Sequence, residues 1–206
     1  IDWFRFPEKV LTSRDEYFYD WFEDGELNTA YLALDRHIQE GRGGQLALIY
    51  DSPVTGVKKK YTYEELLTEV ELVAGMLKNI GVEKGDRVIL YTPDKYAFLI
   101  IHLGVILSGG VSLPLNFRFT KDEMLFFLRD IGARFVFSSG SQAALICQIK
   151  EGCPDLIEVF DPTEAIAPRG HQRFKEMSQE ASDNCLMVYS SGTTGRPKGV
   201  VHTHGN

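Results

Sequence analysis

The chain has 206 residues, of which 44% are hydrophobic and 25% charged, and its formal net charge at pH 7 is −7. This length can bury a core as one domain or two, and the composition is that of an ordinary soluble globular protein. The negative net charge argues against a nucleic-acid partner but does not prevent a local basic loop from binding phosphates.

The first 44 residues are rich in aromatic and acidic side chains, and we predict an N-terminal extension over residues 1–44 that packs on the core. Asn28 is predicted to cap a helix that runs past His37 to the glycines at 41, 43 and 44. Residues 46–50 read as a strand and residues 58–61 as its return, with turn residues between them. We therefore expect a hairpin at the start of an α/β unit over residues 45–206.

Strands and helices then alternate. Thr62 with Glu65 and Thr120 with Glu123 form capping boxes, and Gly81 and Gly132 are the matching stop signals. The predicted helices cover residues 62–80, 96–107, 120–131 and 141–149, and the predicted strands cover residues 87–91, 111–115, 135–137, 156–160 and 185–189. Residues 161–183 read as an exposed connection with one short helix. This order predicts a three-layer αβα fold with a mainly parallel sheet.

One uncharged stretch could be mistaken for a membrane span. Residues 96–117 carry no ionised side chain, and an uncharged stretch of this length is long enough to cross a bilayer as a helix. His102, Ser108, Gly109-Gly110 and Pro114 interrupt it, so we predict a buried helix followed by a short strand and no membrane span.

Residues 189–199 read Tyr-Ser-Ser-Gly-Thr-Thr-Gly-Arg-Pro-Lys-Gly and follow directly on a predicted strand. Glycines let backbone N–H groups approach an anion, and successive N–H groups form an anion-binding nest. The hydroxyls add donors, the two cations add positive charge, and Pro197 stiffens the turn. Ligands of parallel sheets bind at the carboxyl ends of strands, where this loop begins. The chemistry indicated is the binding of a polyphosphate.

Two better-known phosphate loops do not fit. The P-loop requires G-x-x-x-x-G-K-[ST], but counting from Gly192 puts Pro197 in place of the second glycine, and counting from Gly195 puts Val200 there. The dinucleotide fingerprint G-x-G-x-x-G is also absent. A P-loop hydrolase or kinase is therefore disfavoured. The alternative to a phosphate-binding loop is a Gly/Ser-rich surface turn that binds no ligand.

The loop matches, residue for residue, the [ST]-S-G-[ST]-T-G-x-P-K-G signature of the adenylate-forming superfamily, and the chain resembles the N-terminal part of its acyl-CoA synthetases. Weaker similarities to acetyl- and propionyl-CoA synthetases lie at Trp21-Phe22 and in residues 25–28, 34–37, 47–51 and 61–66. The resemblance implies the N-terminal subdomain of the adenylate-forming fold. It also implies a cytoplasmic or mitochondrial-matrix ligase, and the sparse cysteines, without C-x-x-C spacing, favour such a reducing compartment.

The implied reaction joins a carboxylic acid to CoA through an acyl-adenylate, with ATP, Mg²⁺ and CoA as cofactors. Acetate or propionate is the first expectation. However, residues 115–118 read Leu-Asn-Phe-Arg where the short-chain enzymes carry Gly-Gly-Phe, so malonate, medium-chain or aryl acids stay open, as does loading of a carrier protein. A non-catalytic nucleotide-binding or scaffold module is the alternative from another class.

The resemblance also assigns residues. ATP phosphates would be bound by Ser190, Ser191, Gly192, Thr193, Thr194, Gly195, Arg196, Lys198 and Gly199. Lys198 is the expected cation, whereas Arg196 ranks lower because its position admits substitution. His204 is a candidate wall of the acyl pocket. His202 and His204 could pair on a metal, but no third ligand is evident, and no metal centre is expected.

In this superfamily the catalytic lysine, the Mg²⁺-binding glutamate and the segments that bind adenine and ribose follow the phosphate loop. No certain catalytic residue is therefore expected within these 206 residues. We expect the remainder of a longer enzyme to be the chain's partner, and the isolated chain to be inactive in adenylation.

Overall fold

The structure is a computed structural model that describes residues 5–13, 15–16, 19–22, 24–25, 28–93, 96–166, 172–175, 179–190 and 197–205. Its centre is a six-stranded sheet with the strand order β10-β9-β6-β5-β7-β8. All neighbouring strands are parallel except β10 and β9, which are antiparallel. In chain order the strands are β5 (Arg87–Leu90), β6 (Val111–Pro114), β7 (Phe135–Phe137), β8 (Glu158–Phe160), β9 (Asn184–Ser190) and β10 (Lys198–Thr203).

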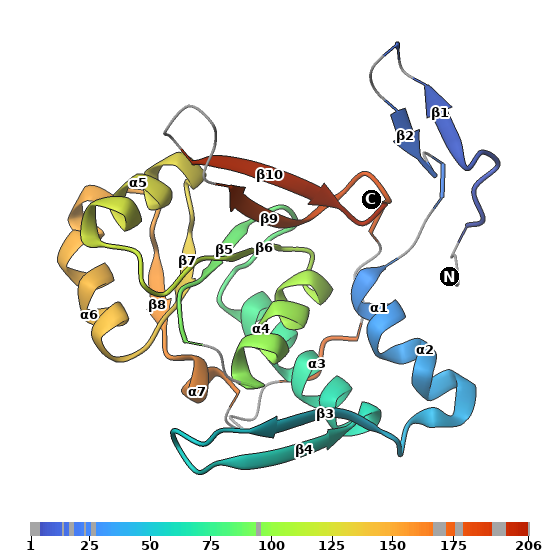
Figure 1. The fold of residues 1–206 in the computed structure, drawn as a ribbon, viewed down its shortest axis with the longest axis horizontal. Coiled ribbons are helices and arrows are strands. Elements are labelled where there is room, and N and C mark those ends of the chain that lie inside the picture. The colour runs from blue at the N-terminus through green and yellow to red at the C-terminus, as the bar shows by residue number, and fades with distance from the viewer. Residues whose placement is uncertain are drawn as a thin grey trace.

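Helices cover both faces of this sheet, which confirms the predicted α/β class. Helices α3 and α4 lie on one face, and α5 and α6 lie on the other (Figure 1). The helices are α3 (Tyr63–Asn79), α4 (Tyr96–Leu107), α5 (Lys121–Ile131) and α6 (Gly140–Ile149), followed by a single 3₁₀ turn at Lys150–Gly152. Their bounds agree with the predicted ones within about two residues.

Local chemistry explains where the helices begin and end. Both predicted capping boxes form: Thr62 accepts from the backbone of Glu65, and Thr120 from that of Glu123. Gly132 ends α5 in the left-handed region at φ 59°, which a glycine adopts without steric cost. Helix α4 buries residues on all its sides, as expected for a helix enclosed between the sheet and α3.

Strand β5 shows how the core is divided. Val88 and Leu90 face the cluster formed with α3 and α4, whereas Ile89 between them faces the cluster formed with α5 and α6. Successive side chains of a strand point to opposite faces, so a strand buried on both faces must be apolar throughout. The uninterrupted apolar run of residues 88–90 therefore specifies a central strand.

Two small sheets lie outside the main one. Strands β3 (Leu46–Asp51) and β4 (Lys58–Thr62) form the predicted hairpin, but it is a separate two-stranded sheet beside α3 (Figure 1). Strands β1 (Leu11–Ser13) and β2 (Tyr19–Trp21) pair antiparallel near the N-terminus. The second pair was not predicted, because three-residue strands give almost no periodic signal.

The predicted N-terminal helix is broken, so its continuity was wrong. Asn28 caps α1 (Thr29–Ala33) as expected, through its side chain and the backbone N–H groups of Ala30 and Tyr31. Leu34, at φ −128° and ψ −69°, then separates α1 from α2 (Asp35–His37), and a π-helical turn, Ile38–Arg42, follows. Leu34 is buried in the core, and we attribute the break to this packing.

The connection over residues 161–183 is less exposed than predicted. A short helix, α7 (Pro162–Ala165), does form. However, Gln179 is buried, and its Nε2 donates to the carbonyl of Ile106 at 2.6 Å. Residues 172–175 cross α3, where the Phe174 backbone donates to the Glu71 carbonyl at 3.1 Å and Arg173 pairs with the buried Glu71 carboxylate at 2.5 Å. The charge of Arg173 in this segment is therefore paired with a buried carboxylate of α3.

No helix within the described ranges combines the length and the apolar character needed to cross a membrane.

The crossing of α3 by residues 172–175 makes a prediction about Gly75. A Cβ at this position would lie 1.9 Å from the carbonyl oxygen of Gln172, which belongs to the backbone and cannot rotate away. We expect Gly75→Ala to lower the free energy of unfolding by up to about 2 kcal/mol, because an overpacking cost near the top of the usual range of about 1–3 kcal/mol exceeds the helix-propensity gain of about 1 kcal/mol. Urea unfolding measures this.

Gly44→Ala is the matched control, because a Cβ there meets nothing within 4 Å. We expect its stability to stay within about 0.5 kcal/mol of the wild type. Equal stabilities of the two variants would contradict the close approach of residue 172 to α3.

Candidate functional site

The glycine-rich motif lies between β9 and β10, which form an antiparallel hairpin. Ser190, the last residue of β9, is the register partner of Lys198, the first residue of β10, and Tyr189 is the partner of Gly199. The structure therefore brings Ser190, Lys198 and Gly199 together at the base of the loop. The other predicted phosphate-binding residues, Ser191, Gly192, Thr193, Thr194, Gly195 and Arg196, lie outside the described residues.

The sheet determines where this base sits. Strand β9 pairs in parallel with β6, so the carboxyl ends of β5, β6 and β9 point to the same edge of the sheet. Along β9, Met187 and Tyr189 pack on the α5–α6 side, and Leu186 packs on the α3–α4 side. Cys185 is buried as predicted, and burial raises the pKa of its thiol, so it is a packing residue rather than a nucleophile.

Tyr189 connects the hairpin to α5. Its hydroxyl donates to Oδ2 of Asp130 at 2.6 Å, and its ring meets Phe127 edge-on with 4.8 Å between centroids. Burial, followed by the hydrogen bond to Asp130, raises the pKa of Tyr189, so the hydroxyl keeps its proton. Across the hairpin, a Cβ at Gly199 would lie 2.0 Å from Met187 Cε and 3.3 Å from Tyr189 Cζ, so glycine leaves room for both side chains.

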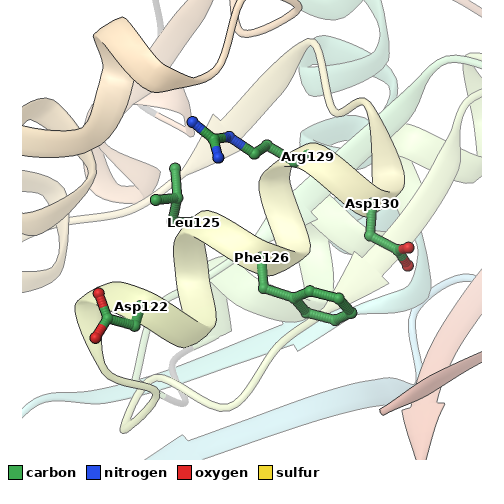
Figure 2. Close-up of a pocket in the computed structure, with 5 residues that line it drawn as sticks. All are labelled: Asp122, Leu125, Phe126, Arg129 and Asp130. Carbon is green, nitrogen blue, oxygen red and sulfur yellow. The ribbon is translucent and has the colours of Figure 1, made fainter. Parts of the chain in front are cut away.

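A hollow of about 480 Å³ lies along α5 next to this contact. It is lined by Asp122, Leu125, Phe126, Arg129 and Asp130, all from the same helix (Figure 2). Phe126 and Asp130 project to one side of α5, and Leu125 and Arg129 to another (Figure 2). The hollow is therefore an open helix surface, and its lining residue Asp130 accepts the hydrogen bond from Tyr189 of the hairpin.

A second pocket, of about 380 Å³, lies at the carboxyl ends of β5 and β6. Its lining residues are Tyr91, Phe117, Arg118, Phe119, Ser141, Gln142 and Leu145. Gln142 donates to the Phe117 carbonyl at 3.2 Å, and Tyr91 donates to the Phe119 carbonyl at 2.7 Å. Sequence reasoning did not select Ser141, Gln142 or Leu145, although their place in the helix that follows a parallel strand was an available signal.

His204 lies just after β10, and its side chain is only 3% exposed. Its Nδ1 lies 3.3 Å from the Thr29 hydroxyl and 3.4 Å from the Thr29 backbone nitrogen, and its own backbone donates to Asp183. Burial lowers the pKa of His204 to about 4. The ring is therefore neutral at physiological pH and is held between the N-terminal segment and the hairpin.

The suggested pairing of His202 with His204 is altered by a register shift between His202 and Thr203, which ends their simple i, i+2 relation on a strand. Within the described ranges, no three or more His, Cys, Asp or Glu side chains gather in a group that could hold a metal ion.

Two family models match the chain. Residues 34–206 match the model described as AMP-binding enzyme, and residues 1–33 match the model described as acetyl-coenzyme A synthetase N-terminus. Together the two matches cover every residue.

Curated relatives match the chain end to end. It is 34% identical to the mitochondrial acyl-CoA synthetase short-chain family member 3 of Bos taurus, over 100% of this chain and 34% of the relative. It is 31% identical to an acetyl-coenzyme A synthetase of Campylobacter jejuni, over 98% of this chain and 34% of that enzyme. The chain thus spans about a third of the length of these relatives.

Solved structures share the fold. The anthranilate CoA ligase AuaEII, in complex with anthranoyl-AMP, superposes with a TM-score of 0.74 at 26% identity, over 85% of this chain and 33% of that one. The N-terminal domain of FACL13 from Mycobacterium tuberculosis superposes with a TM-score of 0.72 at 29% identity, over 86% of this chain and 44% of that one. These matches establish the α/β arrangement as that of adenylate-forming N-terminal domains.

The buried His204 predicts an acid-sensitive stability. In the unfolded chain His204 takes up a proton below about pH 6.5, whereas in the folded chain it does so only below about pH 4. The stability linked to His204 is therefore intact above pH 6.5 and is lost as the pH falls toward 4. At pH 4.5 we expect a loss of about 2–3 kcal/mol relative to pH 7.5.

Urea unfolding of the wild type and of His204→Asn at both pH values isolates this contribution, since the carboxylates are common to both proteins. His202→Asn, at a half-buried position two residues away, is the control for the loss of a histidine side chain from this hairpin. The same pH dependence in His204→Asn as in the wild type would show that His204 does not titrate as described.

Proposed function

Since this chain belongs to the family of AMP-binding enzymes, we propose that it is the N-terminal part of an acyl-CoA synthetase, a carboxylate–CoA ligase. The observation that carries the proposal is the hairpin register that places Ser190 opposite Lys198 at the base of the glycine-rich loop. A hydroxyl and a cation facing each other where a nest-forming loop begins are suited to a polyphosphate.

The proposed reaction has two steps. A carboxylate oxygen attacks the α-phosphorus of ATP, and the bond to pyrophosphate breaks, which leaves an acyl-adenylate. The CoA thiol then attacks the acyl carbon, loses its proton and displaces AMP. The main barrier in the first step is the approach of an anion to a highly charged polyphosphate, so donors fixed in advance around the phosphates are the expected remedy.

The residues divide this task. Lys198 supplies a point charge to the β- and γ-phosphates, and Ser190 donates a hydroxyl hydrogen bond from the opposite strand. Backbone N–H groups and hydroxyls of Ser191, Gly192, Thr193, Thr194 and Gly195 are proposed to enclose the same phosphates, with Arg196 in a supporting role. When bound, Mg²⁺ would neutralise phosphate charge. We assign it no protein ligand, because within the described ranges no metal-binding group of side chains gathers.

Short-chain acids are the favoured substrates. The curated short-chain relatives cover 98–100% of the chain, and residues 1–33 match the model described as acetyl-coenzyme A synthetase N-terminus. We therefore propose acetate or propionate, with CoA as the acceptor and His204 as a candidate wall of the acyl pocket. The proposed location is the cytoplasm or the mitochondrial matrix.

We also propose that residues 1–44 form an extension that packs on the α/β unit of residues 45–206. Ala30 and Leu34 support this boundary, because both are buried in the core cluster of α3 and α4 although they precede the α/β unit.

Acid-dependent exchange of pyrophosphate into ATP tests the function. With the full-length protein and a panel of acetate, propionate, malonate, octanoate and benzoate, we expect exchange with acetate or propionate at the highest kcat/KM. Exchange with octanoate or benzoate alone would support the proposed ligase activity but would contradict the proposed preference for short-chain acids. No exchange with any acid would reject the ligase and favour the non-catalytic module.

Lys198 provides the sharpest test within the site. We expect Lys198→Ala in the full-length protein to lower kcat/KM for ATP by about ten- to a hundredfold, since a charge-assisted contact contributes about 1–3 kcal/mol. Lys60→Ala removes an exposed lysine on the separate β3–β4 hairpin and should leave kcat/KM unchanged. Equal kcat/KM values for the two variants would show that Lys198 does not contribute to binding the ATP phosphates.

A further inference from the structure

Tyr189 occupies a particular place relative to the proposed phosphate loop. It directly precedes Ser190 in β9, and its register partner Gly199 directly follows Lys198 in β10. Both ends of the loop therefore emerge within one residue of the Tyr189–Gly199 pair. An interaction that holds Tyr189 in place therefore also restricts the positions of Ser190 and Lys198.

The side chain of Tyr189 is held at both its ring and its hydroxyl. The hydroxyl donates to Asp130 at 2.6 Å, and the ring packs edge-on against Phe127 with 4.8 Å between centroids. Phe127 and Asp130 are three positions apart, so they lie on neighbouring parts of one α5 face. Phe127 is itself buried and packs against Phe119 at 4.8 Å.

Helix α5 is a firm support for this contact. Its capping box fixes the N-terminus, and Gly132 ends it. Between them Met124, Phe127, Leu128 and Ile131 are all buried against the sheet. A helix held by capping and by an apolar face keeps its backbone in place, which keeps Asp130 within reach of the Tyr189 hydroxyl.

Strand β9 is held by β6 and by packing on both helical layers, whereas the outer strand β10 has little support of its own. Within the described ranges β10 pairs only with β9, and Val200 and Val201 are 46% and 43% exposed. An isolated two-stranded hairpin is only marginally stable in water, so β10 and the loop end of β9 depend on contacts with the rest of the fold. The packing of Tyr189 on α5, close to the loop, provides such a contact.

We propose that Tyr189 and Asp130 form an anchor that positions the phosphate-binding loop by fixing the β9–β10 hairpin to α5. Tyr189 and Asp130 are thus positioning residues that act through Ser190 and Lys198. The predicted effect of the anchor on ATP binding rests on the proposed function of the loop. Its predicted effect on the stability of the hairpin does not depend on that function.

Three single substitutions separate the hydrogen bond from ordinary packing. Tyr189→Phe keeps the ring against Phe127 and removes only the hydroxyl. Asp130→Asn keeps an acceptor oxygen and is the conservative variant that should largely retain the contact. Tyr31→Phe is the matched control, because the Tyr31 hydroxyl also donates to a side-chain oxygen, that of Gln39, at 2.7 Å but on α1.

Hydrogen exchange of the backbone amides over residues 186–203 tests the anchor without reference to activity. In the full-length protein we expect Tyr189→Phe to speed this exchange about three- to tenfold, as for the loss of one hydrogen bond. Asp130→Asn should cause a smaller change, and Tyr31→Phe none. Exchange over these residues that is the same in Tyr189→Phe as in the wild type overturns the anchor.

ATP–pyrophosphate exchange then tests positioning. We expect Tyr189→Phe to raise KM for ATP about three- to tenfold while KM for the acid and the thermal midpoint match those of Tyr31→Phe. The double variant Tyr189→Phe/Asp130→Asn should be no worse than Tyr189→Phe alone, because the two groups act together. An unchanged KM for ATP overturns the positioning role. If the wild type shows no pyrophosphate exchange, the proposed ligase function is rejected. The hydrogen-exchange measurement would still test whether Tyr189 and Asp130 anchor the hairpin.

Discussion

The whole structure depends on the burial of β5 on both faces. This strand pairs in parallel with β6 on one side and β7 on the other, and Val88, Ile89 and Leu90 are fully buried. Parallel strands need crossover connections, and those between β5 and β8 are made by α4, α5 and α6, each of which covers one face of the sheet. The sheet, its two helical layers and the common edge of strand ends all follow from this requirement. The candidate site uses that edge.

The site combines two kinds of strand pairing with different consequences. The parallel strands are enclosed by helices and give the site a fixed frame, whereas the antiparallel β9–β10 hairpin carries a loop between adjacent strands, with no crossover. A short loop places its two ends face to face, which is how residues eight positions apart, Ser190 and Lys198, become neighbours. The register thus sets the Lys198 cation beside the Ser190 hydroxyl in a protein with a net charge of −7.

Much of the fold was predictable because its signals are local. Capping boxes at Thr62 and Thr120 and stop signals at Gly81 and Gly132 act over a few residues, so the helix bounds were correct. The break at Leu34 and the burial of Gln179 were not predictable, since both depend on contacts with distant residues. The loop motif indicated the chemistry, but only the register showed that Ser190 faces Lys198. The contact of Tyr189 with Asp130 has no sequence signal, because 59 positions separate the two residues.

The contact between Thr29 and His204 has a consequence for the order of folding. The two residues are 175 positions apart, so this contact closes almost the entire chain into one loop. Closing a loop of this length carries a large entropic cost before any packing compensates for it, and such contacts form late. On a ribosome, the segment around α1 would leave the exit tunnel long before its partner is synthesised. The Thr29–His204 contact would therefore form only after β10 had emerged, whereas Ala30 and Leu34 of the same segment could already pack on α3 and α4.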